Sequence, residues 1–238
     1  MTGRVQRFAR NQAGRDLIVG DIHGHFTKLQ QALDWVGFNP DVDRLFSVGD
    51  LVDRGPESEA ATEWLAKPWF HAVRGNHEQM AIDFAAGRLR NPSMYVMNGG
   101  GWNLTNRPER SQEIGAAFSA LPLAIEIETE RGLIGVIHAD CPLHTWDELR
   151  TRLNAQDMDA DTDHLVQACV WSRSRIGAGF GDDVGGVRAV VVGHTPVERM
   201  TSLANVIYID TGGWLGRQFT ILDAATLSPA FKTLPEAA

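Results

Sequence analysis

The chain has 238 residues, 43% of them hydrophobic, and a formal net charge of −8. The acidic balance argues against binding to nucleic acid or to an anionic membrane, since both require a net basic face. No segment reaches the ~20 apolar residues of a membrane span, and two cysteines fit a reducing compartment, so we expect a cytoplasmic protein.

The chain is predicted to form one domain. It contains no evident linker, tract of low complexity or internal repeat, and its length is enough to bury a full core. We therefore expect a single domain over residues 1–238. The first residues carry several arginines that polar residues interrupt, and we interpret residues 1–15 as a short solvated arm.

Strand, loop and helix alternate three times after this arm. Each unit starts with a short apolar run, passes through a loop with glycine and polar residues, and continues as a helix. Repetition of this order indicates a largely parallel sheet. The predicted strands cover residues 17–19, 45–48 and 70–73, and the predicted helices residues 26–36, 57–67 and 78–86.

The second half of the chain is predicted to be richer in strands. The glycine-rich residues 98–103 lack the lysine of a P-loop, and we interpret them as a flexible connection. The expected fold is α/β, with two facing mixed β-sheets flanked by helices. Residues 124–128 and 133–137 are predicted to form a hairpin, and further strands are expected around Val190, around Val206 and at residues 219–222.

Most of the apolar runs end in side chains that can bind a metal ion. Because the strands of a layered α/β sheet present their carboxyl ends to one crevice, these side chains are expected to converge. Asp21 and His23 lie two apart in extended chain and point to the same side, while Asp50 has two oxygens and can bridge two ions. Histidine, aspartate and asparagine without thiolate favour manganese, iron or zinc over calcium. The predicted ligands are Asp21, His23, Asp50, Asn76, His138 and His194.

Three sequence blocks carry a resemblance to a known family. Residues 20–24 (Gly-Asp-Ile-His-Gly), 49–55 (Gly-Asp-Leu-Val-Asp-Arg-Gly) and 74–78 (Arg-Gly-Asn-His-Glu) match it in order and spacing. They resemble the signature blocks of the PPP family of Ser/Thr protein phosphatases, within the calcineurin-like metallophosphoesterase superfamily. The likeness is greatest to the bacteriophage-lambda type and its bacterial relatives. It extends through residues 98–102, 136–140, 170–173, 193–196 and 208–212.

The resemblance implies a centre of two divalent metal ions. Asp21, His23 and Asp50 would hold the first ion. The second would be held by Asp50, Asn76, His138 and His194. Manganese is the expected metal, with iron and zinc as alternatives. A hydroxide between the ions would attack phosphorus directly, so no phosphoenzyme is required.

Five further residues are candidates for catalysis or phosphate binding. His77, oriented by Asp53, is predicted to protonate the leaving alkoxide. The alternative for His77 is that it only orients phosphate. The alternative for Asp53 is that it is an ion-pair partner of an arginine. Arg54 and Arg74 lie next to ligand residues in sequence and are expected to grip phosphate oxygens. Arg173 matches a phosphate-binding arginine of the phage-type enzymes, and its alternative role is a surface ion pair.

The favoured hypothesis is a metal-dependent phosphoprotein phosphatase for phosphoserine and phosphothreonine, with tolerance of phosphotyrosine. The alternatives are a symmetrical dinucleoside-tetraphosphate hydrolase, a small-molecule phosphoesterase and, in another class, a non-catalytic phosphoprotein-binding module. In the tetraphosphatase relatives, alanine tends to replace Asp53 and aspartate to replace Glu78, so both residues favour the protein phosphatases. Ala139 and Asp140 stand where eukaryotic relatives carry two glycines, and no regulatory subunit is implied.

Overall fold

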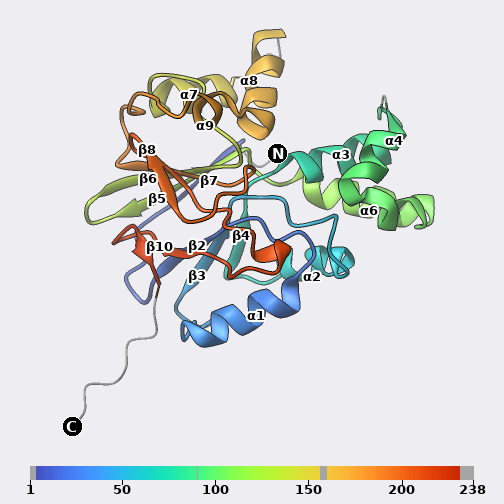
Figure 1. The fold of residues 1–238 in the computed structure, drawn as a ribbon, viewed down its shortest axis with the longest axis horizontal. Helices are drawn as coiled ribbons and strands as arrows, with labels where there is room; N and C mark the ends of the chain where they lie inside the picture. The colour runs from blue at the N-terminus through green and yellow to red at the C-terminus, as the bar shows by residue number, and fades with distance from the viewer. Residues whose placement is uncertain (1–3, 90, 156–159, 231–238) are drawn as a thin grey trace.

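Two β-sheets lie face to face between layers of helices in the computed structural model (Figure 1). The structure describes residues 4–89, 91–155 and 160–230. Helices α7 (Trp146–Leu153) and α8 (Ala160–Trp171) pack on the outer face of one sheet, and α1 (Phe26–Trp35) and α2 (Ala61–Leu65) on the outer face of the other. The predicted α/β class, with two mixed sheets flanked by helices, is confirmed.

The five-stranded sheet contains the three parallel strands predicted for the first half of the chain. Its order is β11-β10-β2-β3-β4, and β10 runs antiparallel to β2. The carboxyl ends of β2, β3 and β4 therefore meet at one edge. The strands are β2 (Asp16–Val19), β3 (Arg44–Ser47), β4 (Phe70–Ala72), β10 (Ile221–Asp223) and β11 (Ser228–Pro229).

The six-stranded sheet has the order β1-β5-β6-β7-β9-β8. Strands β5 and β6 form the predicted antiparallel hairpin, while β7 is parallel to both β6 and β9. This sheet is therefore mixed as well. Its strands are β1 (Val5–Phe8), β5 (Ala124–Thr129), β6 (Gly132–Ile137), β7 (Ala189–Val192), β8 (Thr201–Leu203) and β9 (Val206–Tyr208).

The expectation of a solvated N-terminal arm is wrong for residues 5–8. They form β1, an edge strand parallel to β5. Val5 packs against the core cluster on one face of this sheet and Phe8 against the cluster on the other. Arg7 forms an ion pair with Glu128 of β5 at 2.7 Å. The arginines in this segment suggested solvent exposure, and the strand with which it pairs, β5, lies far away in sequence.

The helices depart from prediction in two places. Residues 57–67 form a 3₁₀ turn, η1 (Ser58–Ala60), and the short α2, in place of one helix. Most of residues 98–103, expected to be a flexible connection, belong to the short helices η2 (Val96–Gly100) and α5 (Gly101–Leu104), which meet at a kink where Gly99 has a φ of 99°. None of the described helices has the length and apolar character that a membrane span requires. The remaining elements are α3 (Asn76–Ala85), α4 (Pro92–Tyr95), α6 (Pro108–Ser119), α9 (Ser174–Ala178) and η3 (Gly213–Leu215).

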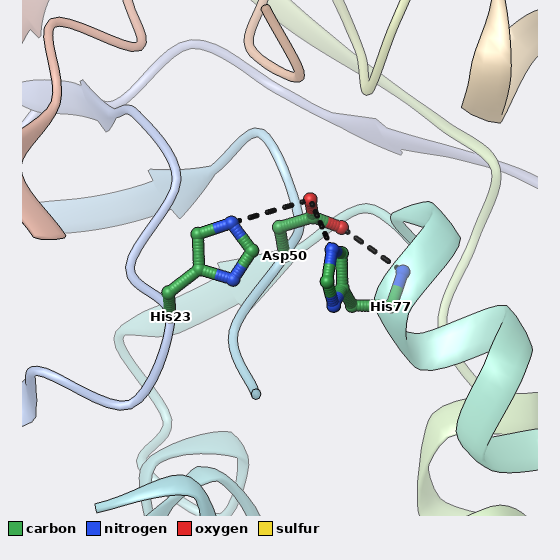
Figure 2. Close-up of side chains that lie close together, drawn as sticks. All are labelled: His23, Asp50 and His77. Carbon is green, nitrogen blue, oxygen red and sulfur yellow. Dashed lines mark hydrogen bonds and ion pairs between the residues drawn. The ribbon is translucent and has the colours of Figure 1, made fainter. Parts of the chain in front are cut away.

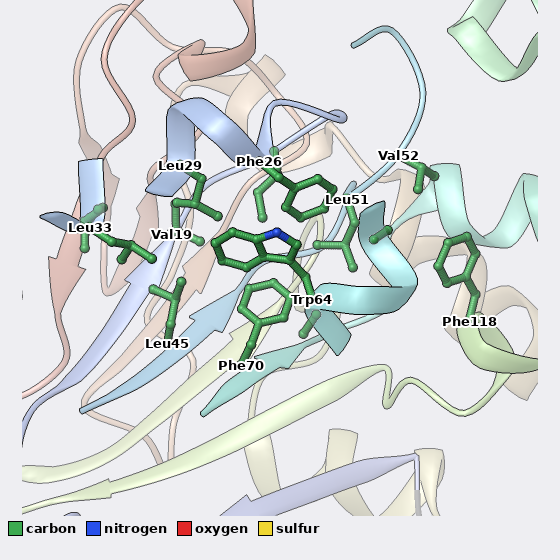
Figure 3. Close-up of a cluster of buried hydrophobic side chains, with 14 of the residues drawn as sticks. Val19, Phe26, Leu29, Leu33, Leu45, Leu51, Val52, Trp64, Phe70 and Phe118 are labelled. Atoms are coloured by element: carbon green, nitrogen blue, oxygen red, sulfur yellow. The ribbon is translucent and has the colours of Figure 1, made fainter. Parts of the chain in front are cut away.

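Alternation along the strands divides the core into layers. In β2, Ile18 faces the cluster between the two sheets, whereas Leu17 and Val19 face the helices outside. Trp64 lies at the centre of that outer cluster, with its ring centroid 5.2 Å from Phe26 (Figure 3). Apolar packing on both faces of each sheet fixes the strand ends that carry the predicted metal ligands.

His71 of β4 packs against two aromatic rings. Its ring lies 4.4 Å from the Phe8 ring and 5.2 Å from the Phe46 ring, centroid to centroid. Burial, and then the charge of Arg44, lowers the pKa of His71 to about 4. The folded protein therefore resists protonation of a group that takes up a proton near pH 6.5 in an unfolded chain.

Acid is expected to weaken the fold through His71. Between about pH 6.5 and about pH 4 the unfolded chain binds this proton and the native chain does not, so stability falls as the pH falls through that window. A His71→Phe substitution removes the titrating group. Urea unfolding of metal-free protein should then depend less on pH in the variant than in the wild type. Equal pH dependence in both proteins would contradict this role.

Candidate metal centre

The six predicted metal ligands lie on loops that follow five strands from both sheets. Asp21 and His23 follow β2, Asp50 follows β3, and Asn76 opens α3 directly after β4. His138 and His194 follow β6 and β7 of the other sheet. All six side chains are buried away from solvent.

Asp50 lies at the centre of this group. Its Oδ2 is 3.6 Å from Nε2 of His23 and 3.7 Å from Nε2 of His77 (Figure 2). Its Oδ1 faces the other way, 3.3 Å from Nε2 of His138. One carboxylate thus joins two clusters of potential ligands, His23 with His77 and His138 with His194. This is the geometry that a bridging ligand requires.

Backbone carbonyls orient the histidine rings. Nδ1 of His23 lies 2.8 Å from the carbonyl of Val52, and Nδ1 of His138 lies 2.7 Å from that of Val48. Since a carbonyl only accepts, each Nδ1 carries a proton, and Nε2 of His23 keeps a lone pair. Nε2 of His138 instead faces Oδ1 of Asn76 at 2.9 Å as well as Asp50, and the charge and hydrogen bond of Asp50 outweigh burial and raise the pKa of His138. His194 has the opposite arrangement, with Nε2 3.2 Å from the carbonyl of Trp171. Its Nδ1 is the nitrogen left for a metal.

The electrostatics of the site fit divalent cations. Burial, followed by the charges of Asp210 and Asp50, raises the pKa of Asp21 well above its usual range. Burial also lowers the pKa of His23 and, together with the charge of His138, brings that of His194 to about 3. Imidazoles and crowded carboxylates are the donor set of a transition-metal site, and buried carboxylates require a compensating cation. The residues present therefore fit the two ions expected.

Strained backbone holds several of these side chains in place. Five residues of the site adopt a positive φ that non-glycine residues rarely take. Gly193 shows how tightly the loops approach, since a Cβ there would lie 2.0 Å from Oδ1 of Asp21. Such strain persists only where surrounding contacts determine the conformation. The strained residues are His23 (44°), Asp50 (50°), Asp53 (69°), Arg54 (68°) and His194 (65°).

His77 and Asp53 form the predicted pair. Nδ1 of His77 is 2.7 Å from Oδ2 of Asp53, and both side chains are buried. Burial raises the pKa of Asp53, although the bond to His77 opposes that effect. Nε1 of Trp102 in α5 donates to Oδ1 of Asp53 at 2.7 Å. Sequence reasoning missed this role of Trp102, although the resemblance extended through residues 98–102.

Glu78 is a second residue whose role was missed. Its carboxylate accepts hydrogen bonds from the backbone N–H groups of Gly75 (2.8 Å), Asp50 (3.0 Å) and Leu51 (2.8 Å). Burial and the charge of Asp50 raise the pKa of Glu78 to about 7. Glu78 thus ties the start of α3 to the loop that carries Asp50. From the sequence, Glu78 was interpreted only as a residue that distinguishes protein phosphatases from the tetraphosphatase relatives.

The three predicted phosphate-binding arginines are placed differently. Arg54 reaches the site, with Nη1 2.9 Å from Nε2 of His23. Arg173 is exposed at the start of α9, and its charge contributes to the low pKa of His194.

Arg74 does not point to the metal ligands. Its Nη2 donates to the carbonyls of Ser119 (2.8 Å) and Leu121 (3.2 Å), at the end of α6. The expectation that it faces the crevice was therefore wrong for this structure. The unpaired carbonyls at a helix C-terminus attract a guanidinium group, and proximity in sequence to Asn76 did not reveal them.

A family model described as calcineurin-like phosphoesterase matches residues 15–199. The chain belongs to the calcineurin-like phosphoesterase family. It is 37% identical to Serine/threonine-protein phosphatase 1 of Salmonella typhimurium, over 86% of this chain and 89% of that protein. It is 34% identical to Serine/threonine-protein phosphatase 2 of Escherichia coli, over 88% and 92% of the two chains.

The solved structures include the same fold. A structure described as that of a candidate diadenosine tetraphosphatase matches with a TM-score of 0.65 and 20% identity, over 97% of this chain and all of that one. The likeness supports the arrangement of sheets and helices. At this level of identity it does not decide between substrates.

The Asp50→Asn substitution is expected to remove metal from the calcineurin-like centre. Asparagine has no charge and one oxygen, so it cannot replace a carboxylate that faces both clusters. Elemental analysis after dialysis should find less than one manganese per chain, against about two for the wild type. Asp34→Asn on the exposed face of α1 is the control and should keep its metal. Full occupancy in Asp50→Asn would contradict the bridging role.

Proposed function

We propose that this phosphoesterase is a protein phosphatase that hydrolyses phosphoserine and phosphothreonine monoesters, with tolerance of phosphotyrosine. The observation that carries the proposal is the buried His77–Asp53 pair beside Asp50. It supplies an oriented acid next to the residues that would hold two divalent ions. The names of the similar bacterial proteins support the same substrate class.

The residues divide the chemistry among them. Two divalent ions, when bound, supply a nucleophile at neutral pH and offset the negative charge at phosphorus. Asp53 fixes the His77 ring through Nδ1, which leaves Nε2 facing the crevice. A proton at Nε2 can pass to the serine or threonine oxygen as the P–O bond breaks, since an unprotonated alkoxide is a poor leaving group. Arg54 and Arg173 would bind phosphate oxygens.

The main alternative is hydrolysis of dinucleoside tetraphosphates. A candidate diadenosine tetraphosphatase shares the fold, which leaves this alternative open. Against it, Asp53 is present, buried and bonded by both His77 and Trp102, so the acid pair is intact. A small-molecule phosphoesterase would use the same centre. A non-catalytic phosphoprotein-binding module is disfavoured, because none of the six candidate ligands is replaced by a residue that could not bind a metal ion.

His77→Asn should slow phosphate release without removing metal. We expect kcat on phosphopeptides with added manganese to fall by about 10²- to 10⁴-fold, the usual contribution of a general acid. Manganese content should stay unchanged by elemental analysis. His164→Asn, on the exposed face of α8, makes the same substitution away from the site and should keep full activity. Undiminished kcat in His77→Asn would remove His77 from the mechanism.

Substrate preference tests the proposal directly. Rates on phosphoserine, phosphothreonine and phosphotyrosine peptides should be compared with the rate on a dinucleoside tetraphosphate, at equal manganese. We expect higher kcat/KM on the serine and threonine peptides, because His77 assists a leaving group that needs protonation. Preference for the tetraphosphate would refute the protein phosphatase proposal and leave the metal centre unaffected.

A further inference from the structure

Among the described residues, two side chains contact the guanidinium group of Arg54. One is His23, whose Nε2 lies 2.9 Å from Nη1 of Arg54. The other is Trp214 of η3, whose ring centroid lies 4.4 Å from Cζ of Arg54. Arg54 itself is exposed at the edge of the site. Its position therefore depends on one hydrogen bond and one cation–π contact.

These two contacts respond differently to a metal ion. Nδ1 of His23 donates a hydrogen bond to the carbonyl of Val52, so the proton of the neutral ring is on Nδ1. Nε2 then has a single lone pair, which accepts the hydrogen bond from Nη1 of Arg54. A metal ion held by His23 would take that lone pair, and Arg54 would lose the bond. The indole of Trp214 is not a metal ligand. Its contact with Arg54 can persist.

Several contacts fix the position of Trp214 and of the turn that carries it. Its ring meets the His23 ring edge to face, at 4.6 Å and 69°. Nζ of Lys28 in α1 donates to the carbonyl of Gly213, at 2.6 Å. Gly213 also packs closely on Phe219, whose Cδ1 would lie 2.1 Å from a Cβ at that position. Contacts from α1 and from the chain after η3 thus fix the turn that carries the indole.

We propose that Trp214 is a positioning residue for Arg54. Its indole face keeps the guanidinium at the metal centre once a metal ion occupies the His23 nitrogen, so that Arg54 remains available to phosphate oxygens. The inference rests on the proposed function, since it concerns how that site keeps a phosphate-binding arginine in place. Trp214 acts through Arg54 and makes no bond to phosphate itself.

A double-mutant cycle on inorganic phosphate binding tests the inference. Manganese-loaded wild type, Trp214→Leu, Arg54→Ala and the double variant are titrated with inorganic phosphate by calorimetry. Trp214→Leu should raise Kd about two- to five-fold, the effect of losing an exposed cation–π contact. Trp214→Phe keeps an aromatic face and should restore most of the affinity. Leu215→Ala, the exposed neighbour in the same turn, should bind like the wild type.

The cycle separates positioning from general support. If Trp214 acts through Arg54, Trp214→Leu changes nothing further in the Arg54→Ala background. An equal loss of affinity in both backgrounds, or an unchanged Kd in Trp214→Leu, would overturn the inference. So would loss of manganese from Trp214→Leu, which would assign Trp214 to the support of His23. Phosphate binding does not require turnover, so inactivity on phosphopeptides would refute the proposed function and leave this test readable.

Discussion

The buried carboxylate of Asp50 is the constraint on which the site depends. Burial alone would raise its pKa, but the neighbouring His138, His77 and His23, with the charge and hydrogen bond of His138 foremost, outweigh burial and hold that pKa well below its usual range. The partners arrive from three other strand ends, one of them in the second sheet. A charge buried this deeply is tolerated only where such partners are fixed in place. The two sheets therefore have to meet in one register.

A supporting set of contacts keeps this arrangement rigid. Glu78 binds three backbone N–H groups around Asp50, Trp102 holds Asp53, and Trp214 lies under Arg54. Gly99 adds to them, because a Cβ there would lie 2.3 Å from the backbone nitrogen of Arg54. These contacts compensate for the strained φ angles of the ligand loops. The geometry of the loops thus depends on Glu78 within a signature block and on Gly99, Trp102 and Trp214 outside the blocks.

The sequence could nominate six candidate ligands because each one follows a strand within a few residues. Apolar runs, glycines and polar side chains at the strand ends are local signals, and parallel strand order brings such ends together. The same locality explains the errors. The strand at Val5–Phe8 depends on pairing with β5, and the direction of Arg74 depends on carbonyls at the end of α6. Neither partner is near in sequence.

By itself, the sequence determined the α/β class, the hairpin of β5 and β6, and the set of candidate metal ligands, because short-range periodicity and motif spacing encode them. Only the tertiary structure decided that Asp50 faces both histidine clusters, that Arg74 turns away, and that Trp102 and Trp214 brace Asp53 and Arg54. Side-chain direction follows from packing and hydrogen bonding between segments far apart along the chain. No local pattern contains that information.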